Sequence, residues 1–223
     1  IEVPYILELD QEQKIYEKMI RRSDFNDAHI APHSLKIASM FSVMSRLQPS
    51  NKCDMLTKMK IYNGEDVIEK GRVKNIDIND LKDEVENEGM TGISTRFIMK
   101  SLDNALSDSE KNMITPIGAI DSLVKQVKEQ IIDEIRKIYD PELPVNIYEL
   151  GLIYDIKVED DKFVKIKMTL TTPNCPVAES LPKEVKEGAM QVEGIDDVSL
   201  ELVWDPPWNK DMMSDAAKLE LNL

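Results

Sequence analysis

Residues 152–170 read LIYDIKVEDDKFVKIKMTL and contain two runs in which apolar and polar side chains alternate. Strict alternation is typical of a β-strand with one buried face, and the polar stretch from Glu159 to Lys162 between the runs predicts a turn. The stretch therefore predicts a β-hairpin with Lys165 and Lys167 on its solvent-exposed face. The apolar positions are Leu152, Tyr154, Ile156 and Val158 in the first run, and Val164, Ile166, Met168 and Leu170 in the second.

Helical patterns flank this hairpin. The upstream pattern stops at the turn containing Pro141 and Pro144, because proline cannot continue a helix. The downstream pattern stops at Gly194, and a third alternating run follows over residues 198–202. The order α-β-β-α-β predicts a small two-layer domain over residues 127–223. The helix-forming apolar residues are Val127, Ile131, Ile135 and Ile138 upstream, and Val177, Leu181, Val185 and Ala189 downstream.

The first half of the chain has a helical period instead. Apolar residues at helical spacing predict helices near residues 10–20, 32–48, 53–59 and 94–105, with a last one starting at Pro116. Residues 63–90 are acidic and irregular, with a turn signal at Asn63-Gly64. We expect an all-α domain over residues 1–126, so the fold class of the whole chain is α+β.

Composition limits the classes of partner. The net charge is −14, with −5 in residues 1–123 (16 Lys and Arg against 21 Asp and Glu) and −9 in residues 124–223 (12 against 21). An acidic chain without a basic stripe repels a phosphate backbone, so we expect no nucleic-acid partner. No apolar run approaches the roughly 20 residues of a membrane span, and no signal peptide is visible, so we expect no membrane partner.

The two cysteines lie 122 positions apart and give neither a disulfide framework nor a CxxC metal site. This usage predicts a reducing cytoplasm. The chain opens at Ile1 within an alternating run and without Met, which predicts a fragment of something longer or a processed chain.

Cys175 stands between Asn174 and Pro176, just before a helix expected to begin near Val177. A thiol at a helix N-terminus meets unpaired N–H groups, which favour the thiolate, so we expect its pKa to lie below the free value of about 8.5. If the loops carrying Asp140, Glu142, Thr171 and Thr172 converge on Cys175, soft sulfur beside hard oxygen suits iron or a transient cluster. Cys175 as a small buried hydrophobe is the alternative. One cysteine cannot hold a cluster alone, so further ligands must come from another subunit or a partner.

Three motifs resemble the SufT and PaaD-like iron-sulfur assembly family. They are DPELPVNIYELGLIY at residues 140–154, MTLTTPNCP at 168–176 and VWDPPW at 203–208. The resemblance implies a cytoplasmic assembly factor with Cys175 as its functional thiol. It places Asp140, Glu142, Leu143, Thr171 and Thr172 in the supporting pocket. The implied partners are iron-sulfur assembly machinery and client apoproteins, and a homo-oligomer stays open.

Trp204 and Trp208 bracket a Pro-Pro pair in an aromatic-poor chain. They are expected to cap the core below the third strand, with a partner-docking surface as the alternative. The tail from Asp211 to Leu223 predicts a short amphipathic helix.

In the first half, a glycine turn and a capping Ser94 place Arg96 in the first turn of a helix. A cation is unfavourable at that end of the helix dipole, so Arg96 either serves an anion such as a nucleotide phosphate or is an ordinary solvated arginine. The motifs KIYEK (14–18), APHSL (31–35), KIYNGE (60–65) and EGMTGISTRF (88–97) resemble the helical lid of the AAA+ module of PrkA-type serine protein kinases. That resemblance implies a nucleotide-sensing role for Arg96.

The sequence contains no G-x-x-x-x-G-K-[ST] loop and no apolar strand ending in paired acids. We therefore expect no enzyme activity of this chain alone, and ATP and Mg²⁺ only if an AAA+ core lies upstream. The leading hypothesis is an iron-sulfur assembly factor fused to a lid fragment. The alternatives are a fragment of a PrkA-type serine kinase and an adaptor that joins a kinase complex to iron-sulfur maturation.

Overall fold

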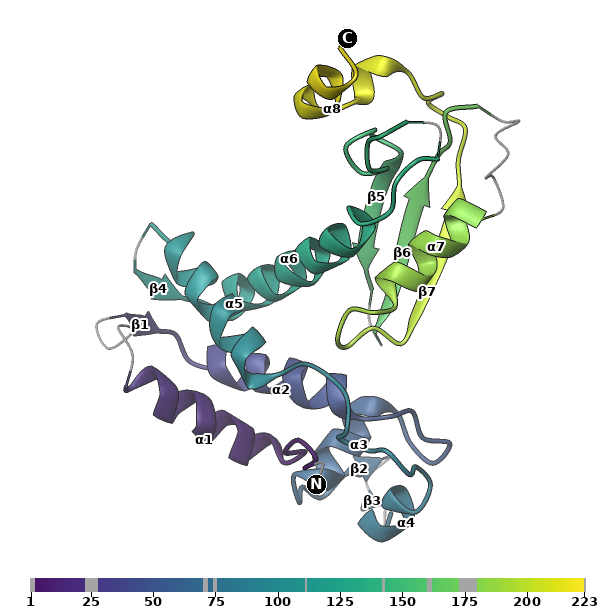
Figure 1. Ribbon diagram of the computed structural model, residues 1–223. Coiled ribbons are helices and arrows are strands. Elements are labelled where there is room, and N and C mark those ends of the chain that lie inside the picture. The colour runs from purple at the N-terminus through teal and green to yellow at the C-terminus, as the bar shows by residue number, and fades with distance from the viewer. Residues whose placement is uncertain are drawn as a thin grey trace. The chain divides into compact units, whose positions relative to one another are not determined.

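The computed structural model of the chain describes residues 3–22, 28–69, 72–73, 76–110, 112–141, 143–159, 162–172 and 180–222 (Figure 1). It divides into two compact units, residues 1–124 and 125–223. The division falls within α6 (Pro116–Ile135), a single 20-residue helix that Pro116 begins as expected. The α+β class is confirmed. The domain assignment 1–126 and 127–223 stays a prediction.

The first unit is built mainly from helices. Its elements are α1 (Leu9–Ile20), β1 (His29–Ile30), α2 (Ser34–Arg46), α3 (Met55–Tyr62), β2 (Ile68–Glu69), β3 (Arg72–Val73), α4 (Ile78–Lys82), α5 (Thr95–Ser107) and β4 (Met113–Ile114). Helices α1 and α2 pack side by side (Figure 1). Their apolar faces join α3 and α4 in one buried cluster, which contains Leu9, Val43, Leu47, Met59, Tyr62 and Leu81.

The expectation of an all-α first half is wrong in detail, because the unit contains four two-residue strands. β1 pairs in parallel with β4, and β2 pairs antiparallel with β3. The region expected to be irregular also contains α4, whose N-cap Asp77 accepts a hydrogen bond from the Asn79 amide at 2.8 Å. Two-residue pairings are too short to produce an alternating pattern, and the parallel pair joins segments about 80 residues apart, so local sequence gives no signal for them.

Two ion pairs lie buried inside the first unit. Arg46 Nη2 lies 2.8 Å from Glu12 Oε1, and both side chains are almost completely buried. Lys58 Nζ lies 2.6 Å from Glu88 Oε2, again inside the unit. The Glu12 carboxylate also accepts hydrogen bonds from Tyr16 and Ser42. The first pair joins α1 to α2 through charge as well as through apolar packing, and the second joins α3 to the loop between α4 and α5.

The second unit contains a three-stranded sheet in the order β5-β6-β7. β5 (Ile153–Val158) pairs antiparallel with β6 (Phe163–Met168), and β6 pairs in parallel with β7 (Asp197–Leu202). A parallel pair needs a crossover, and α7 (Ser180–Ala189) lies on that crossover and packs along β7 (Figure 1). A 3₁₀ turn (Lys210–Met212) and α8 (Asp215–Glu220) complete the described chain.

One face of this sheet is buried and the other is charged. Val164, Ile166 and Met168 of β6 are fully buried. On α7, Val185 and Ala189 are fully buried and Leu181 is nearly so. On the opposite face Lys165 pairs with Glu159 at 2.8 Å and Lys167 with Glu201 at 3.6 Å. Both lysines are exposed, as the alternating pattern predicts.

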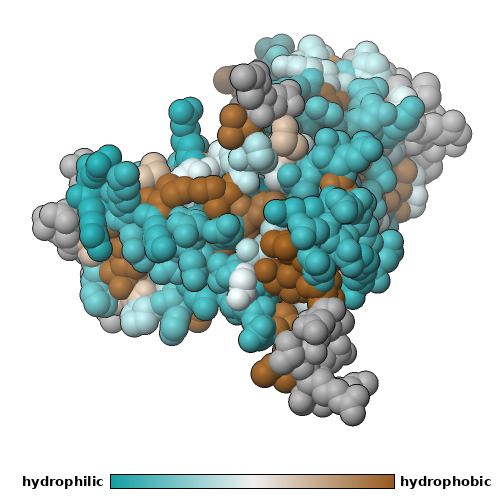
Figure 2. All heavy atoms as spheres, turned by 90° about the horizontal axis from the view of Figure 1, so that it is seen from below, coloured by the Kyte–Doolittle hydropathy of each residue, from teal (hydrophilic) through white to brown (hydrophobic). Residues whose placement is uncertain are grey.

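The face shown in Figure 2 is mostly hydrophilic, with apolar side chains in several groups. Among the described residues, no helix combines the length and the apolar character that a membrane crossing requires.

Candidate thiol site

Asp140 closes the turn that follows α6. Its Oδ1 accepts a hydrogen bond from the Leu143 amide at 3.1 Å, and its own amide donates to the Val145 carbonyl at 3.3 Å. The side chain of Asp140 is buried at 8% exposure, and Leu143 is half-buried. The structure thus brings together two of the predicted pocket residues. Glu142, predicted beside them, lies outside the described residues.

The segment of residues 146–152 connects this turn to the end of β6. The Ile147 amide donates to the Ile138 carbonyl at 3.0 Å, and Asn146 pairs antiparallel with Tyr139. At the other end of the segment, the Leu152 carbonyl accepts a hydrogen bond from the Thr169 amide at 2.8 Å. Backbone hydrogen bonds therefore join the Asp140 turn to the strand end that leads to the predicted threonine pair.

The threonines at the end of β6 differ in burial. Thr171 is half-buried and Thr172 is exposed. Thr169, which carried no signal in the sequence, is fully buried, and its hydroxyl has no hydrogen-bond partner among the described residues. Because Lys165 and Lys167 are exposed, strict alternation would place Thr169 on the solvent side of the strand as well. The local sequence therefore does not predict that Thr169 is buried.

Cys175 lies outside the described residues, as does the expected helix start near Val177. The lowered thiol pKa and the convergence of the five pocket residues on Cys175 stay predictions. Among the described residues no three His, Cys, Asp or Glu side chains are grouped as metal ligands. The other cysteine, Cys53, is half-buried and packs against the core of the first unit.

Arg96 is exposed in the first turn of α5, as its position in the sequence suggested. Ser94 caps this helix, because its Oγ accepts a hydrogen bond from the Phe97 amide at 3.4 Å. The nucleotide-sensing role implied for Arg96 stays a prediction.

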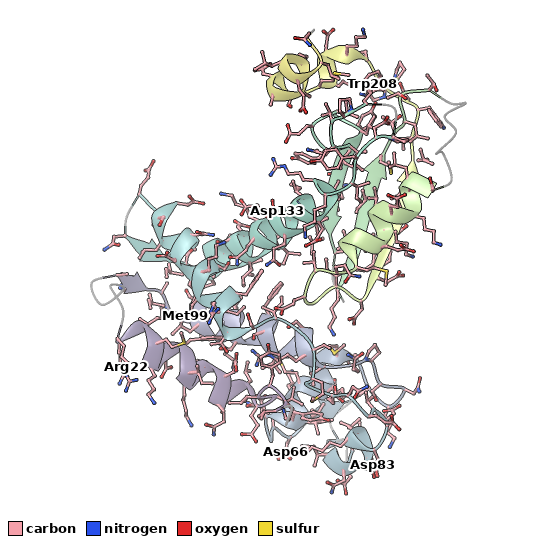
Figure 3. The ribbon with its side chains drawn as sticks, in the orientation of Figure 1. Arg22, Asp66, Asp83, Met99, Asp133 and Trp208 are labelled. Atoms are coloured by element: carbon pink, nitrogen blue, oxygen red, sulfur yellow. The ribbon has the colours of Figure 1, made fainter. Side chains whose placement is uncertain are left out.

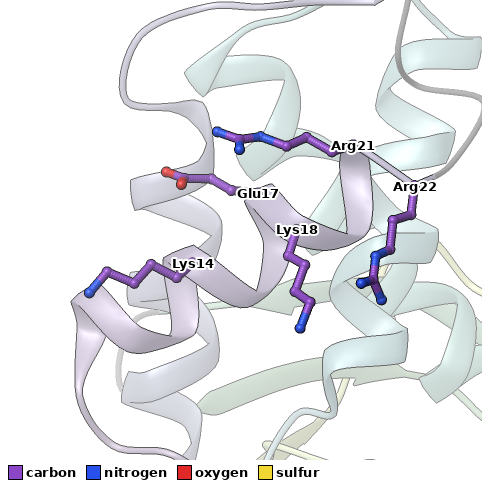
Figure 4. Close-up of a pocket in the computed structure, with 5 residues that line it drawn as sticks. All are labelled: Lys14, Glu17, Lys18, Arg21 and Arg22. Carbon is purple, nitrogen blue, oxygen red and sulfur yellow. The ribbon is translucent and has the colours of Figure 1, made fainter.

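A second cationic feature lies on α1 and the residues just after it. Lys14, Lys18, Arg21 and Arg22 line a shallow hollow together with Glu17 (Figure 4). Three of the cations fall at the C-terminal end of the helix, where positive charge complements the helix dipole. The hollow therefore has a sufficient explanation in helix electrostatics.

Comparison with known proteins decides the relationship of the second unit. Residues 128–202 match the family model described as iron-sulfur cluster assembly protein. An Fe-S protein maturation auxiliary factor from Porphyromonas gingivalis is 49% identical over 96 residues, which cover 43% of this chain and 91% of the relative. The chain belongs to this iron-sulfur cluster assembly family. A crystal structure of a domain of unknown function from Bacillus anthracis is 32% identical, covers 44% of this chain and 94% of that chain, and aligns with a TM-score of 0.42.

The first unit has relatives of a different kind. Residues 1–54 match the PrkA AAA domain, and residues 56–145 match the PrkA serine protein kinase C-terminal domain. An ATP-dependent protease PrkA from Bacillus subtilis is 39% identical over 123 residues, which cover 54% of this chain and 19% of the relative. The chain thus spans about a fifth of the length of that relative. Both resemblances found in the sequence are confirmed.

Proposed function

We propose that this chain matures iron-sulfur proteins by accepting iron or a transient cluster at Cys175 and passing it to client apoproteins. The observation that carries the proposal is the 49% identity to nearly the whole length of an Fe-S protein maturation auxiliary factor. Two further maturation factors, from Bacillus subtilis and Staphylococcus aureus, are 39% and 40% identical over most of their lengths.

The chemistry assigned to Cys175 is that of a thiolate ligand. The thiol loses its proton when it binds iron, and that proton passes to solvent. Cluster iron prefers thiolate sulfur, so one cysteine supplies one ligand and a second copy or a partner supplies the others. Asp140, Glu142, Thr171 and Thr172 are proposed to offer oxygen atoms around the cargo, with Leu143 packing beside them. A reducing cytoplasm suits this function, because it keeps the thiol free.

The Asp140 turn supports this assignment. Its carboxylate is held by the Leu143 amide, and its backbone is tied through residues 146–152 to the strand end that precedes Cys175. The turn thus holds a carboxylate in one place and is joined to that strand end by backbone hydrogen bonds.

Anaerobic reconstitution with ferrous iron and sulfide tests the proposal. The wild-type chain is expected to develop the visible absorbance of a sulfide-bridged iron cluster, and Cys175→Ser is expected to lose it. Cys53→Ser is the matched control, because it removes the second of the two cysteines and should load like wild type. Equal loading of Cys175→Ser and wild type would remove the proposal.

A second candidate is a part of a PrkA-type ATP-dependent enzyme whose core lies elsewhere. Its support is the match of residues 1–54 and 56–145 to PrkA domains and the exposure of Arg96 in the first turn of α5. Relatives carry the names ATP-dependent protease and serine/threonine kinase. In this reading Arg96 touches the phosphates of bound ATP, and Mg²⁺ comes with the core. An upstream reading frame that encodes a G-x-x-x-x-G-K-[ST] loop would favour it, and an upstream stop codon would count against it.

A further inference from the structure

The residues that follow β7 fold back over the second unit. We call residues 203–214 the C-terminal strap, and they lie beyond residues 128–202, the region that the iron-sulfur family model covers. Trp208, labelled in Figure 3, donates from Nε1 to the Leu150 carbonyl at 2.8 Å. The Ser214 amide donates to the Glu149 carbonyl at 2.9 Å. The strap therefore donates hydrogen bonds to the carbonyl groups of two successive residues in the segment 146–152.

The approach at Gly151 is closer still. Gly151 has φ +74°, and a Cβ atom added there would lie 2.3 Å from the Met212 carbonyl oxygen. No real Cβ contact is that short, and the obstacle is backbone, which cannot turn aside as a side chain can. Only glycine therefore allows the strap to lie against the segment at this point.

A third hydrogen bond joins the strap to the sheet. The Tyr154 hydroxyl donates to the Pro206 carbonyl at 2.8 Å. Tyr154 belongs to β5, so the strap is held both by the segment 146–152 and by the strand that follows it. The contacts lie on Glu149, Leu150, Gly151 and Tyr154, so all four fall within residues 149–154.

Other hydrogen bonds join the segment 146–152 to the residues just before the Asp140 turn and to the end of β6. Ile147 bonds to Ile138, Asn146 pairs with Tyr139, and Leu152 accepts from Thr169. A displacement of residues 149–151 would therefore reach both the Asp140 turn and the end of β6.

We propose that the C-terminal strap positions the candidate site, with Trp208 and Tyr154 as positioning residues. The strap holds the segment 146–152 in place, and the segment holds the Asp140 turn and the strand end before Cys175. The link to cargo binding rests on the proposed function, whereas the link between strap and turn does not.

Hydrogen exchange on the full chain tests the structural link. Trp208→Phe keeps the aromatic bulk and removes the bond to Leu150. It is expected to speed exchange of the amides of Leu143, Val145 and Ile147 by about fivefold, as the loss of one hydrogen bond predicts. Tyr154→Phe is expected to act in the same direction. Exchange in α1, α2 and α5 should stay unchanged.

Trp204→Phe is the matched control. Trp204 lies on the strap at 44% exposure, and its side chain makes no hydrogen bond to the described residues, so its replacement should leave the Asp140 turn unchanged. The proposal is overturned if Trp208→Phe speeds exchange only within residues 203–214, or if Trp204→Phe speeds exchange of the turn equally.

Iron loading separates this proposal from the proposed function. If wild type loads iron and sulfide, Trp208→Phe is expected to load more slowly at a temperature where both proteins are fully folded. If wild type fails to load while the exchange result holds, the proposed function fails and the positioning role stands. If exchange is unchanged in both variants, the positioning role fails whatever the loading result.

Discussion

The buried charges of the first unit show how single residues set its stability. Arg46 is fully buried. Its guanidinium forms an ion pair with Glu12 and donates hydrogen bonds to the Ile6 carbonyl at 2.9 Å and the Ile93 carbonyl at 3.0 Å. Its guanidinium also lies 4.5 Å from the centre of the Tyr5 ring. A fully bonded buried pair adds little net stability, but removing one partner strands the other in a low-dielectric interior.

Arg46→Met is therefore expected to lower the free energy of unfolding of the first unit by about 3 to 5 kcal/mol, because it leaves the Glu12 carboxylate buried without its cation. Urea denaturation measures the change. Lys52→Met is the matched control, since Lys52 and Asp80 form an exposed ion pair, and its cost should stay below about 1 kcal/mol. A loss of unfolding free energy for Arg46→Met as small as that for Lys52→Met would show that the buried ion pair with Glu12 is unimportant for stability.

Tyr16 gives a prediction about pH. Burial, and then its hydrogen bond to Glu12, raises the pKa of the Tyr16 hydroxyl. The folded state therefore holds this proton to higher pH than the unfolded chain, whose tyrosines ionise near pH 10. The resulting stabilisation is complete below about pH 10 and is lost as the pH rises further. The unfolding free energy should fall more steeply between about pH 9 and pH 11 in wild type than in Tyr16→Phe. Parallel slopes would contradict the assignment.

At the scale of elements, the start of α5 is locked to the end of α2. The Ile93 amide donates to Ser45 Oγ at 2.9 Å, and Arg46 bonds to the Ile93 carbonyl. Gly92 has φ +116°, and a Cβ atom there would lie 2.6 Å from the Ser45 carbonyl oxygen and 2.9 Å from Arg46 Cα. This contact fixes the helix end from which Arg96 projects.

Gly92→Ala is expected to destabilise the first unit by about 3 kcal/mol or more, because strain and backbone overlap add. Thermal and urea unfolding measure the loss. Gly64→Ala is the control for strain alone, since Gly64 has φ +75° but open space around it, and should cost about 1 to 2 kcal/mol. Equal costs at the two glycines would show that the close approach to α2 is unimportant.

The elements also show what sequence can and cannot predict. Local signals were sufficient for α5, where Ser94 is the cap, and for α6, which starts at Pro116. They were sufficient for the alternating runs that form β5 and β6. Local signals failed for β1 and β4, which pair with each other from distant parts of the chain. They also failed for Glu12, Arg46 and Lys58, because these residues look like solvated charges in the sequence and are buried against partners from distant segments.

At the scale of the whole molecule, matches to two different families meet in one chain. The PrkA C-terminal domain match extends to residue 145, and the iron-sulfur family match begins at residue 128, so the two overlap across the C-terminal half of α6 and the Asp140 turn. The sequence was sufficient to recognise both families from their motifs. It gave no signal for the strap contacts at Gly151 or for the burial of Thr169, because both depend on segments far apart in the chain.

Cys175 is proposed to carry the cargo, and transfer from the loaded chain to an apo-ferredoxin tests this role most directly. Visible circular dichroism of the ferredoxin follows the arrival of the cluster. Wild type and Cys53→Ser are expected to deliver it. Cys175→Ser, at an unchanged melting temperature, is expected to do no better than free iron and sulfide. Delivery by Cys175→Ser at the wild-type rate would contradict the claim.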